Sequence, residues 1–205
     1  MALGLKNTDE LSLLRTGQAA ALAELFDHYR PRLARMIAIR FDSRLHGKVD
    51  AEDILQDAFV EAARRIDDFL RRPAVPLFVW LRQITSQILI DTRRHYVDAK
   101  MRNVNLETGL DWAQSGEDGS AFFAAQLADS LTTPSQFAVR EEMLLELRST
   151  LDSLEPIDRE VLVLRHLEEL TNDEVAAVLD INPYAASKRY LRALKRLRIA
   201  MPVRE

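Results

Sequence analysis

Apolar residues recur every three or four positions in nearly every patterned segment of this chain, which is the spacing of an α-helix. No segment alternates apolar and polar residues for long enough to predict a strand. An interruption is expected at Gly17, and Pro31 permits a new helix to start. We therefore expect an all-α fold, and the 205 residues are enough for one ordinary domain or two small ones.

The clearest sequence signals for the ends of helices lie between residues 50 and 77. Asp50 is expected to be the N-cap of a long helix that runs to about residue 69, with Asp53 three residues later as in a capping box. The segment 71–76 contains two prolines and is predicted to be a loop. Another helix is expected over about 77–96, with its apolar residues at helical spacing.

The middle of the chain differs from both ends. Residues 103–135 contain three glycines, several serines and scattered acidic residues, with weak periodicity, and we interpret them as a linker. Four further helices are predicted after it, over about 137–154, 156–167, 172–179 and 184–198. The sequence therefore predicts two small helical domains joined by an acidic tether.

Composition excludes several classes of protein. The chain has no cysteine, and its four histidines lie far apart, so neither a disulfide scaffold nor a metal enzyme is expected. We find no glycine-rich phosphate loop and no nucleophile elbow, so neither catalysis nor a cofactor is predicted. No apolar run approaches the roughly 20 residues needed to span a membrane, and the charged N-terminus does not resemble a signal peptide. A cytoplasmic location is the expectation.

The net charge of −4 argues against nucleic-acid binding until its distribution is considered. Acidic residues dominate between Glu107 and Glu160, whereas seven basic residues and one acid lie from Lys188 to the end. Charge segregated in this way lets one end of a protein approach phosphate while another end avoids it.

The most specific local pattern is a helix-turn-helix near the C-terminus. Thr171 or Asn172 is expected to cap a short helix, residues 180–182 form the turn, and Pro183 occupies the first position of a second helix. Ala186, Tyr190, Ala193 and Leu197 then form a buried stripe. The side chains left exposed are Tyr184, Ala185, Ser187, Lys188, Arg189, Arg192, Lys195 and Arg196. A basic helix of this kind suits the major groove of DNA, although an ordinary solvated surface helix is the alternative.

A second pattern is an acidic stack on the helix after Asp50. Asp53, Asp57 and Glu61 fall at i, i+4 and i+8 on one outer face, with Gln56 beside them. Like charges at this spacing cost about 0.2–0.5 kcal/mol per pair, a cost that a basic partner often offsets. A solvated acidic face is an equally good interpretation of these residues alone, and a carboxylate metal site is a weaker one.

The helix after the two prolines combines aromatic residues with arginines and amides. Such a surface can stack on unpaired bases and hold their backbone, although Trp80 by itself is as well explained as part of the core. The residues concerned are Phe78, Trp80, Arg82, Gln83, Ser86, Gln87, Arg93, Arg94, Tyr96, Lys100 and Arg102.

Taken in order, these segments carry a family resemblance. They are DAEDILQDAF at 50–59, FVWLRQI at 78–84 with Asp91, Arg93 and Arg94, Thr133-Pro134 with Glu141-Glu142, LEPIDREVLVLR at 154–165, and the helix-turn-helix. In this order the chain resembles the ECF (extracytoplasmic function) group of the sigma-70 family of bacterial sigma factors. The resemblance covers nearly the whole chain except the linker.

The resemblance implies a region 2 domain over about 9–102, a linker over 103–135 and a region 4 domain over about 136–201. It implies a non-catalytic protein that binds core RNA polymerase, through the β′ clamp helices and the β flap, and directs it to promoter DNA. An anti-sigma factor is a further expected partner. Residues expected to bind polymerase are Asp53, Gln56, Asp57 and Glu61. Residues expected at the −10 element are Phe78, Trp80, Arg82, Gln83, Ser86, Gln87, Arg93 and Arg94. Residues expected at the −35 element are Tyr184, Ala185, Ser187, Lys188, Arg189, Arg192 and Arg196.

The sequence departs from the family pattern at a few positions. Gln87 stands where the family usually has Asn, and Asp180 stands where the turn usually has Gly. Because Asp tolerates left-handed backbone, the turn is still expected. The alternative function is a free-standing helix-turn-helix repressor or activator.

Overall fold

The computed structural model describes residues 7–41, 49–95 and 149–200, and within these ranges the regular structure is helical, with no strand. The chain divides into two compact units, Met1–Glu107 and Thr108–Glu205, which are treated separately below as unit 1 and unit 2. The predicted linker lies outside the described residues. None of the described helices has the length and apolarity that a membrane crossing requires.

Helix α1 (Asn7–Arg40) opens unit 1 and contains both Gly17 and Pro31, the two positions where the sequence indicated interruptions. At Gly17 the backbone leaves helical geometry (φ −132°, ψ 24°), and the helix kinks there, as predicted. Pro31, by contrast, does not start a new helix, because α1 continues through it. A proline inside a helix costs about 3 kcal/mol. Pro31 is exposed, while Tyr29 and Leu33 on either side of it are buried, so packing along the opposite face holds the helix together.

Helices α2 (Ala51–Arg71) and α3 (Leu77–Arg93) follow the predicted boundaries closely. The Asp50 carboxylate accepts hydrogen bonds from the backbone N–H groups of Glu52 (2.6 Å) and Asp53 (3.2 Å). The Asp53 carboxylate in turn accepts from the backbone N–H of Asp50 at 3.2 Å, which confirms the capping box.

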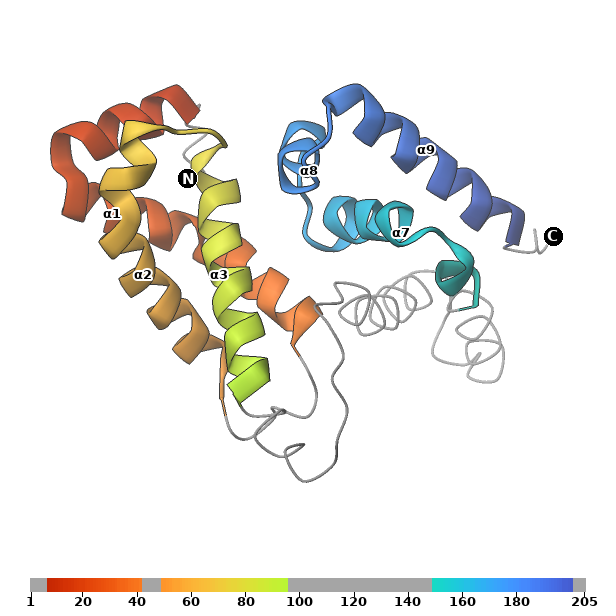
Figure 1. Ribbon diagram of the computed structural model, residues 1–205, viewed down its shortest axis with the longest axis horizontal. Coiled ribbons are helices and arrows are strands. Elements are labelled where there is room, and N and C mark those ends of the chain that lie inside the picture. Colours follow the sequence, from red (N-terminus) through yellow and green to blue (C-terminus); the bar gives the residue numbers. More distant parts are fainter. Residues whose placement is uncertain (1–6, 42–48, 96–148, 201–205) are drawn as a thin grey trace, which may run out of the picture. The chain divides into compact units, whose positions relative to one another are not determined.

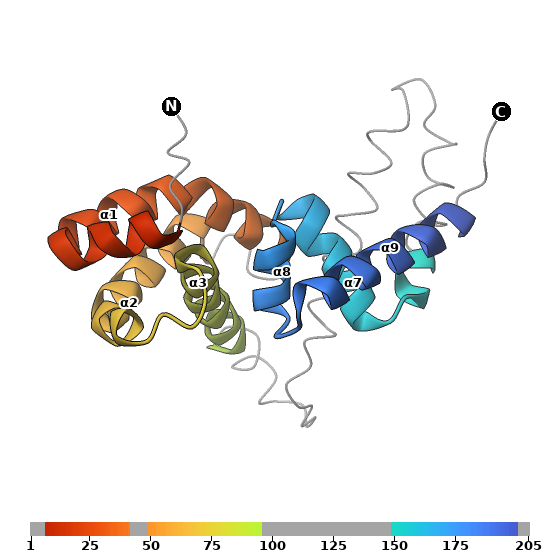
Figure 2. The ribbon, with the colours of Figure 1, turned by 90° about the horizontal axis from the view of Figure 1, so that it is seen from above.

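The core of unit 1 lies where α1, α2 and α3 meet. Helices α2 and α3 run side by side and pack against the same side of α1 (Figures 1 and 2). Rings from two helices meet edge to face at Phe26 and Phe59, with centroids 5.3 Å apart. The Tyr29 hydroxyl donates to the buried carboxylate of Glu10, which ties the two arms of α1 together across the kink. The largest fully buried apolar residues are Phe26, Phe78, Leu14, Leu22, Leu33, Met36, Ile37, Ile54, Leu55 and Leu77.

Unit 2 is built from short helices. Residues 149–153 are helical, and α7 (Pro156–Leu162) continues directly into a π-helical turn, η3 (Val163–Leu167). Helices α8 (Asn172–Val178) and α9 (Pro183–Ala200) complete it, and α9 packs along α7 (Figure 1). The predicted helix over 156–167 is present, with its second half in π rather than α geometry. Only the end of the helix predicted over 137–154 lies within the described residues.

The caps and the turn of the helix-turn-helix are as predicted, and of the predicted buried stripe Ala186, Ala193 and Leu197 are buried whereas Tyr190 is half-buried. The Thr171 hydroxyl accepts from the Glu174 backbone N–H at 3.2 Å, and the Glu174 carboxylate accepts from the Thr171 backbone N–H at 2.8 Å. Asp180 adopts left-handed backbone (φ 51°), as the turn requires. Ile181, in the turn, is half-buried.

Candidate functional site

Three side chains form an exposed polar face on α2, named here the α2 acidic face: Asp53, Gln56 and Asp57. Val60, an apolar side chain that is 42% exposed, lies one turn beyond them. Asp53 also belongs to the capping box, so its carboxylate has a structural task as well.

Glu61 differs from the other acids in the predicted stack. Its side chain is 25% exposed and forms ion pairs with Arg65 (2.5 Å) and Arg64 (3.6 Å) on the same helix. Its charge is therefore largely neutralised within α2, whereas Asp57 presents its carboxylate to solvent.

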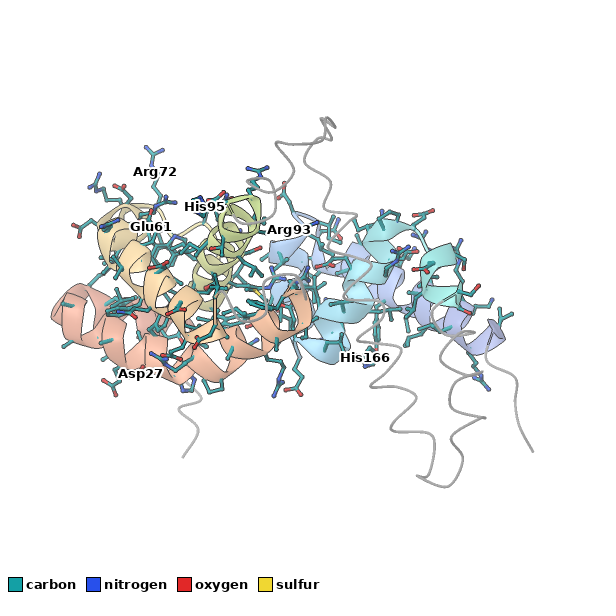
Figure 3. The ribbon with its side chains drawn as sticks, turned by 90° about the horizontal axis from the view of Figure 1, so that it is seen from below. Asp27, Glu61, Arg72, Arg93, His95 and His166 are labelled. Carbon is teal, nitrogen blue, oxygen red and sulfur yellow. The ribbon has the colours of Figure 1, made fainter. Side chains whose placement is uncertain are left out.

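The loop between α2 and α3 is framed by two stacked rings. The Phe69 ring, at the end of α2, stacks on the Trp80 ring, at the start of α3, with centroids 4.4 Å apart. Arg72, in the loop itself, points away from the packed helices (Figure 3). The loop is thus a short, mostly exposed segment whose two ends are joined by the ring stack, and Trp80 is half-buried at its base.

The predicted −10 residues of α3 fall into two groups. Gln83, Gln87 and Arg94 are exposed, with Arg93 half-buried. The Gln87 side-chain amide donates to both carboxylate oxygens of Asp91 at 3.0 Å.

The other predicted residues of α3 lie inside unit 1. Phe78, Arg82 and Ser86 are 2%, 1% and 8% exposed, and the guanidinium of Arg32 sits 3.5 Å from the centre of the Phe78 ring. Helix α3 contacts both α1 and α2, which leaves a narrower exposed stripe than helical spacing alone predicts. These three side chains therefore do not belong to the surface that DNA would meet.

The exposed side of α9, named here the α9 outer face, consists of Tyr184, Lys188, Leu191 and Lys195. Tyr184 is 69% exposed, and the Lys188 ammonium lies 4.6 Å from the centre of its ring. Leu191, which is 63% exposed, lies among these basic side chains and was not among the predicted DNA contacts. Arg196 is also exposed, on the flank of the helix.

Side-chain hydrogen bonds fix the start of α9 against α8. The Asn182 side chain accepts from the Ala185 backbone N–H at 2.8 Å and so caps α9. Asn172 donates to the Pro183 carbonyl at 2.9 Å and accepts from the Ser187 hydroxyl at 3.0 Å. Ser187 is thus half-buried and held by Asn172 of α8, and Ala185 is half-buried with its backbone N–H bonded to Asn182 of the turn, whereas both were predicted to be exposed.

Arg189 and Arg192 are directed toward α7. Arg192 forms a two-pronged contact with Asp158, from Nε to Oδ2 and from Nη2 to Oδ1, both 2.7 Å. Arg189 Nη1 donates to Asp158 Oδ1 at 3.1 Å. Glu155 Oε2 lies 3.3 Å from Arg192 Nη2 and 3.6 Å from Arg189 Nη1.

Asp158 is completely buried, and its titration reflects these contacts. Burial alone would raise the pKa of the Asp158 carboxyl, but the hydrogen bonds from Arg192 and Arg189 outweigh burial and lower it. Asp158 is therefore ionised at neutral pH and holds two arginines of the predicted DNA-binding helix. The sequence prediction had not included Asp158.

His166, a residue of η3, lies beside α9. The Tyr190 hydroxyl and His166 Nε2 are 3.2 Å apart, and the Arg165 guanidinium lies 5.4 Å from the centre of the Tyr190 ring. Partial burial and the neighbouring charge of Arg165 lower the pKa of His166. Among the described residues no group of three or more acidic or histidine side chains is placed to hold a metal ion.

Two family models match the chain in the order of these elements. Sigma-70 region 2 matches residues 25–97, which include the α2 acidic face and α3, and Sigma-70, region 4 matches residues 144–197, which include the helix-turn-helix. Together they account for more than half of the chain. The chain belongs to the sigma-70 family.

Relatives of this sigma factor extend the match along nearly its full length. It is 26% identical over 189 residues to the ECF RNA polymerase sigma-E factor of Escherichia coli K12, covering 91% of this chain and 90% of that protein. It is also 26% identical to the ECF RNA polymerase sigma factor SigW of Bacillus subtilis, covering 90% and 91%. The solved structure of CnrH in complex with the cytosolic domain of CnrY has a similar fold (TM-score 0.50, 24% identity, 94% and 95% covered). The predicted ECF membership is thereby confirmed, and an ECF sigma factor binds core RNA polymerase and directs transcription initiation.

Proposed function

We propose that this sigma factor binds core RNA polymerase through the α2 acidic face of unit 1 and promoter DNA through both units. The observation that carries the proposal is that the matches to region 2 and region 4 coincide with two exposed surfaces of opposite charge, on α2 and on α9. The chain supplies contacts and positioning, and the polymerase performs nucleotidyl transfer. Its place of action would accordingly be the cytoplasm.

Polymerase binding is assigned to Asp53, Gln56 and Asp57, as the family resemblance implies. Asp57 is the best single contact, because it is exposed and has no part in the capping box. Glu61 contributes less, because Arg64 and Arg65 already neutralise its carboxylate. Val60 adds an exposed apolar contact beside the carboxylates.

Contacts to the −10 element are assigned to the exposed part of α3 and to the loop before it. Gln83, Gln87, Arg93 and Arg94 offer amide and guanidinium donors, and Arg72 adds a positive charge from the loop. Trp80 has a supporting role in this proposal, because its ring is stacked on Phe69.

Contacts to the −35 element are assigned to the α9 outer face together with Arg196. Tyr184 and Lys188 lie in the first turns of α9, where a recognition helix approaches base edges. Lys195 and Arg196 lie further along and would hold phosphates.

Charge reversal at Asp57 tests the proposal. Asp57→Lys should weaken binding to core polymerase by at least about tenfold, because a cation would replace a carboxylate opposite a basic partner. Glu24→Lys is the matched control, since Glu24 is an exposed acid on a different helix, α1. Binding would be measured by pull-down of core polymerase and by transcription from genomic fragments.

The alternative, a free-standing repressor or activator, gives a different result in the same experiment. Such a protein would bind a palindromic duplex without polymerase, and neither charge reversal would change that binding. Failure of the wild-type chain to associate with core polymerase would refute the sigma-factor proposal. An anti-sigma factor as regulator remains a prediction from the family resemblance.

A further inference from the structure

The ion pairs between α7 and α9 join a fully buried carboxylate to arginines that are partly exposed. Asp158 is 0% exposed, whereas the side chains of Arg189 and Arg192 are 30% and 45% exposed. Each guanidinium thus has an inner edge held by Asp158 and an outer edge near solvent. Glu155, 56% exposed, lies at this outer side.

The two carboxylates hold the arginines in different ways. Asp158 accepts both prongs of Arg192 at 2.7 Å, which is the strong, oriented form of an arginine–carboxylate pair. Glu155 contacts each arginine through one oxygen at 3.3 Å or more. Exposed single-point pairs of this kind contribute little and exchange readily with other anions. Asp158 is therefore the permanent partner, and Glu155 is the replaceable one.

Arg192 has donors to spare for a second anion. A guanidinium carries five N–H donors. The hydrogen bonds of Arg192 within the described part of unit 2 use Nε and Nη2 only. A DNA phosphate, which carries a full charge and two unesterified oxygens, matches a guanidinium better than a single carboxylate oxygen does.

We propose that Arg189 and Arg192 form a phosphate clamp that Asp158 holds in position and Glu155 covers until DNA displaces it. This inference rests on the proposed function, because it assigns a task to two arginines at the flank of the DNA-binding helix. Asp158 is a positioning residue in this scheme, and Glu155 is a built-in competitor of the DNA backbone. Competition from Glu155 weakens binding of unit 2 to any duplex and therefore favours sites where the α9 outer face adds contacts to bases.

The test uses holoenzyme reconstituted from core polymerase and the full chain. The probe is a duplex that the wild-type holoenzyme selects from sheared genomic DNA. Glu155→Gln should tighten binding about two- to fivefold, which is the effect expected from removing one competing exposed ion pair. Asp158→Asn should weaken binding, because the guanidinium groups lose their fixed orientation.

Two comparisons separate the clamp from a general effect of charge. Asp152→Asn removes the same charge from the same unit, but Asp152 is paired with Arg159 at 3.8 Å rather than with the clamp arginines. It should leave the affinity within a factor of about two. The Glu155→Gln gain should disappear in an Asp158→Asn, Arg189→Gln, Arg192→Gln background, where neutral side chains replace the buried ion pairs and no buried carboxylate is left unpaired.

Each outcome decides the matter. An equal gain from Asp152→Asn, a Glu155→Gln gain that persists when both arginines and Asp158 are neutralised, or no gain from Glu155→Gln would overturn the clamp while leaving the sigma-factor function intact. Absence of a holoenzyme or of any selected duplex with the wild-type chain would instead overturn the proposed function, and the clamp with it.

Discussion

The ring of Trp80 stacks on the ring of Phe69, with an angle of 18° between the planes, and so joins the two ends of the exposed loop between α2 and α3. Residues 73 and 74 of that loop are exposed, and Pro76 leads directly into α3. The stack joins the two ends of the loop while the loop itself stays largely exposed.

Removal of the Trp80 ring should therefore affect both stability and promoter opening. Trp80→Ala should lower the free energy of unfolding by about 1–3 kcal/mol, since the ring is half-buried and stacked. Trp80→Phe, which retains a stacking ring, should recover most of this loss. Denaturant unfolding followed by circular dichroism measures the stability, and permanganate reactivity of promoter thymines measures opening.

Gln83→Ala is the control for the Trp80 variants, because Gln83 is exposed on the same helix. It should leave the free energy of unfolding unchanged within about 0.5 kcal/mol. Full stability of Trp80→Ala would show that the stack does not hold the loop.

Features set by neighbouring residues could be predicted from the sequence. The Asp50–Asp53 capping box, the Thr171 cap and the left-handed Asp180 each depend on contacts within three or four positions. Gly17 belongs to this group as well, because its missing side chain permits the kink locally.

Features that depend on packing between distant segments could not be predicted. Arg82 has the spacing of a surface residue on α3, yet contacts from both α1 and α2 leave its side chain 1% exposed. Asp158 and Arg192 are 34 positions apart, so no periodicity indicates that they pair. Leu191 is a different case, since it lies on α9 away from Ala186 and Ala193, and a helical projection alone could have shown its exposure.

Asp158 should give unit 2 a specific sensitivity to acid. Its folded-state pKa lies below the ordinary value of 3.8, so the stabilisation is complete above that pH and is lost as the pH falls through the lower, folded-state pKa. Asp158→Asn should be less stable than the wild type at about pH 7, by roughly 1–3 kcal/mol, and the two proteins should converge at low pH. Urea unfolding at a series of pH values measures this difference.

The difference in unfolding free energy between Asp158→Asn and the wild type isolates the contribution of the Asp158 carboxylate from those of the other carboxylates. Asp152→Asn should show a small, nearly constant difference, because the Asp152 side chain is 49% exposed. A loss of stability in Asp158→Asn that does not vary with pH would mean that the carboxylate acts through packing rather than through its charge.

His166 should also make the stability of unit 2 depend on pH, in a higher pH range than Asp158 does. Partial burial and the charge of Arg165 lower its pKa below the ordinary 6.5, so the folded protein favours the neutral ring. Below 6.5 the unfolded chain takes up the proton first, and the stability of unit 2 should fall as the pH drops from 6.5 toward the folded-state pKa. His166→Gln should remove this slope, and an NMR titration of the ring should give a midpoint below 6.5. A midpoint above that value would contradict the prediction.

Leu191 should contribute to promoter affinity without contributing to stability. It is 63% exposed in the middle of the α9 outer face, between basic side chains that would approach DNA. An apolar side chain in that position suits the methyl group of a thymine. Leu191→Ala should keep the helix intact, because alanine is the best helix former, and should weaken binding of the holoenzyme to its selected duplex by about fivefold.

Ile199→Ala, a change at a residue 75% exposed in the last turn of α9, should have no such effect. Equal losses in the two variants would indicate a general effect of surface apolarity, and an unchanged affinity for Leu191→Ala would place the base contacts elsewhere on α9.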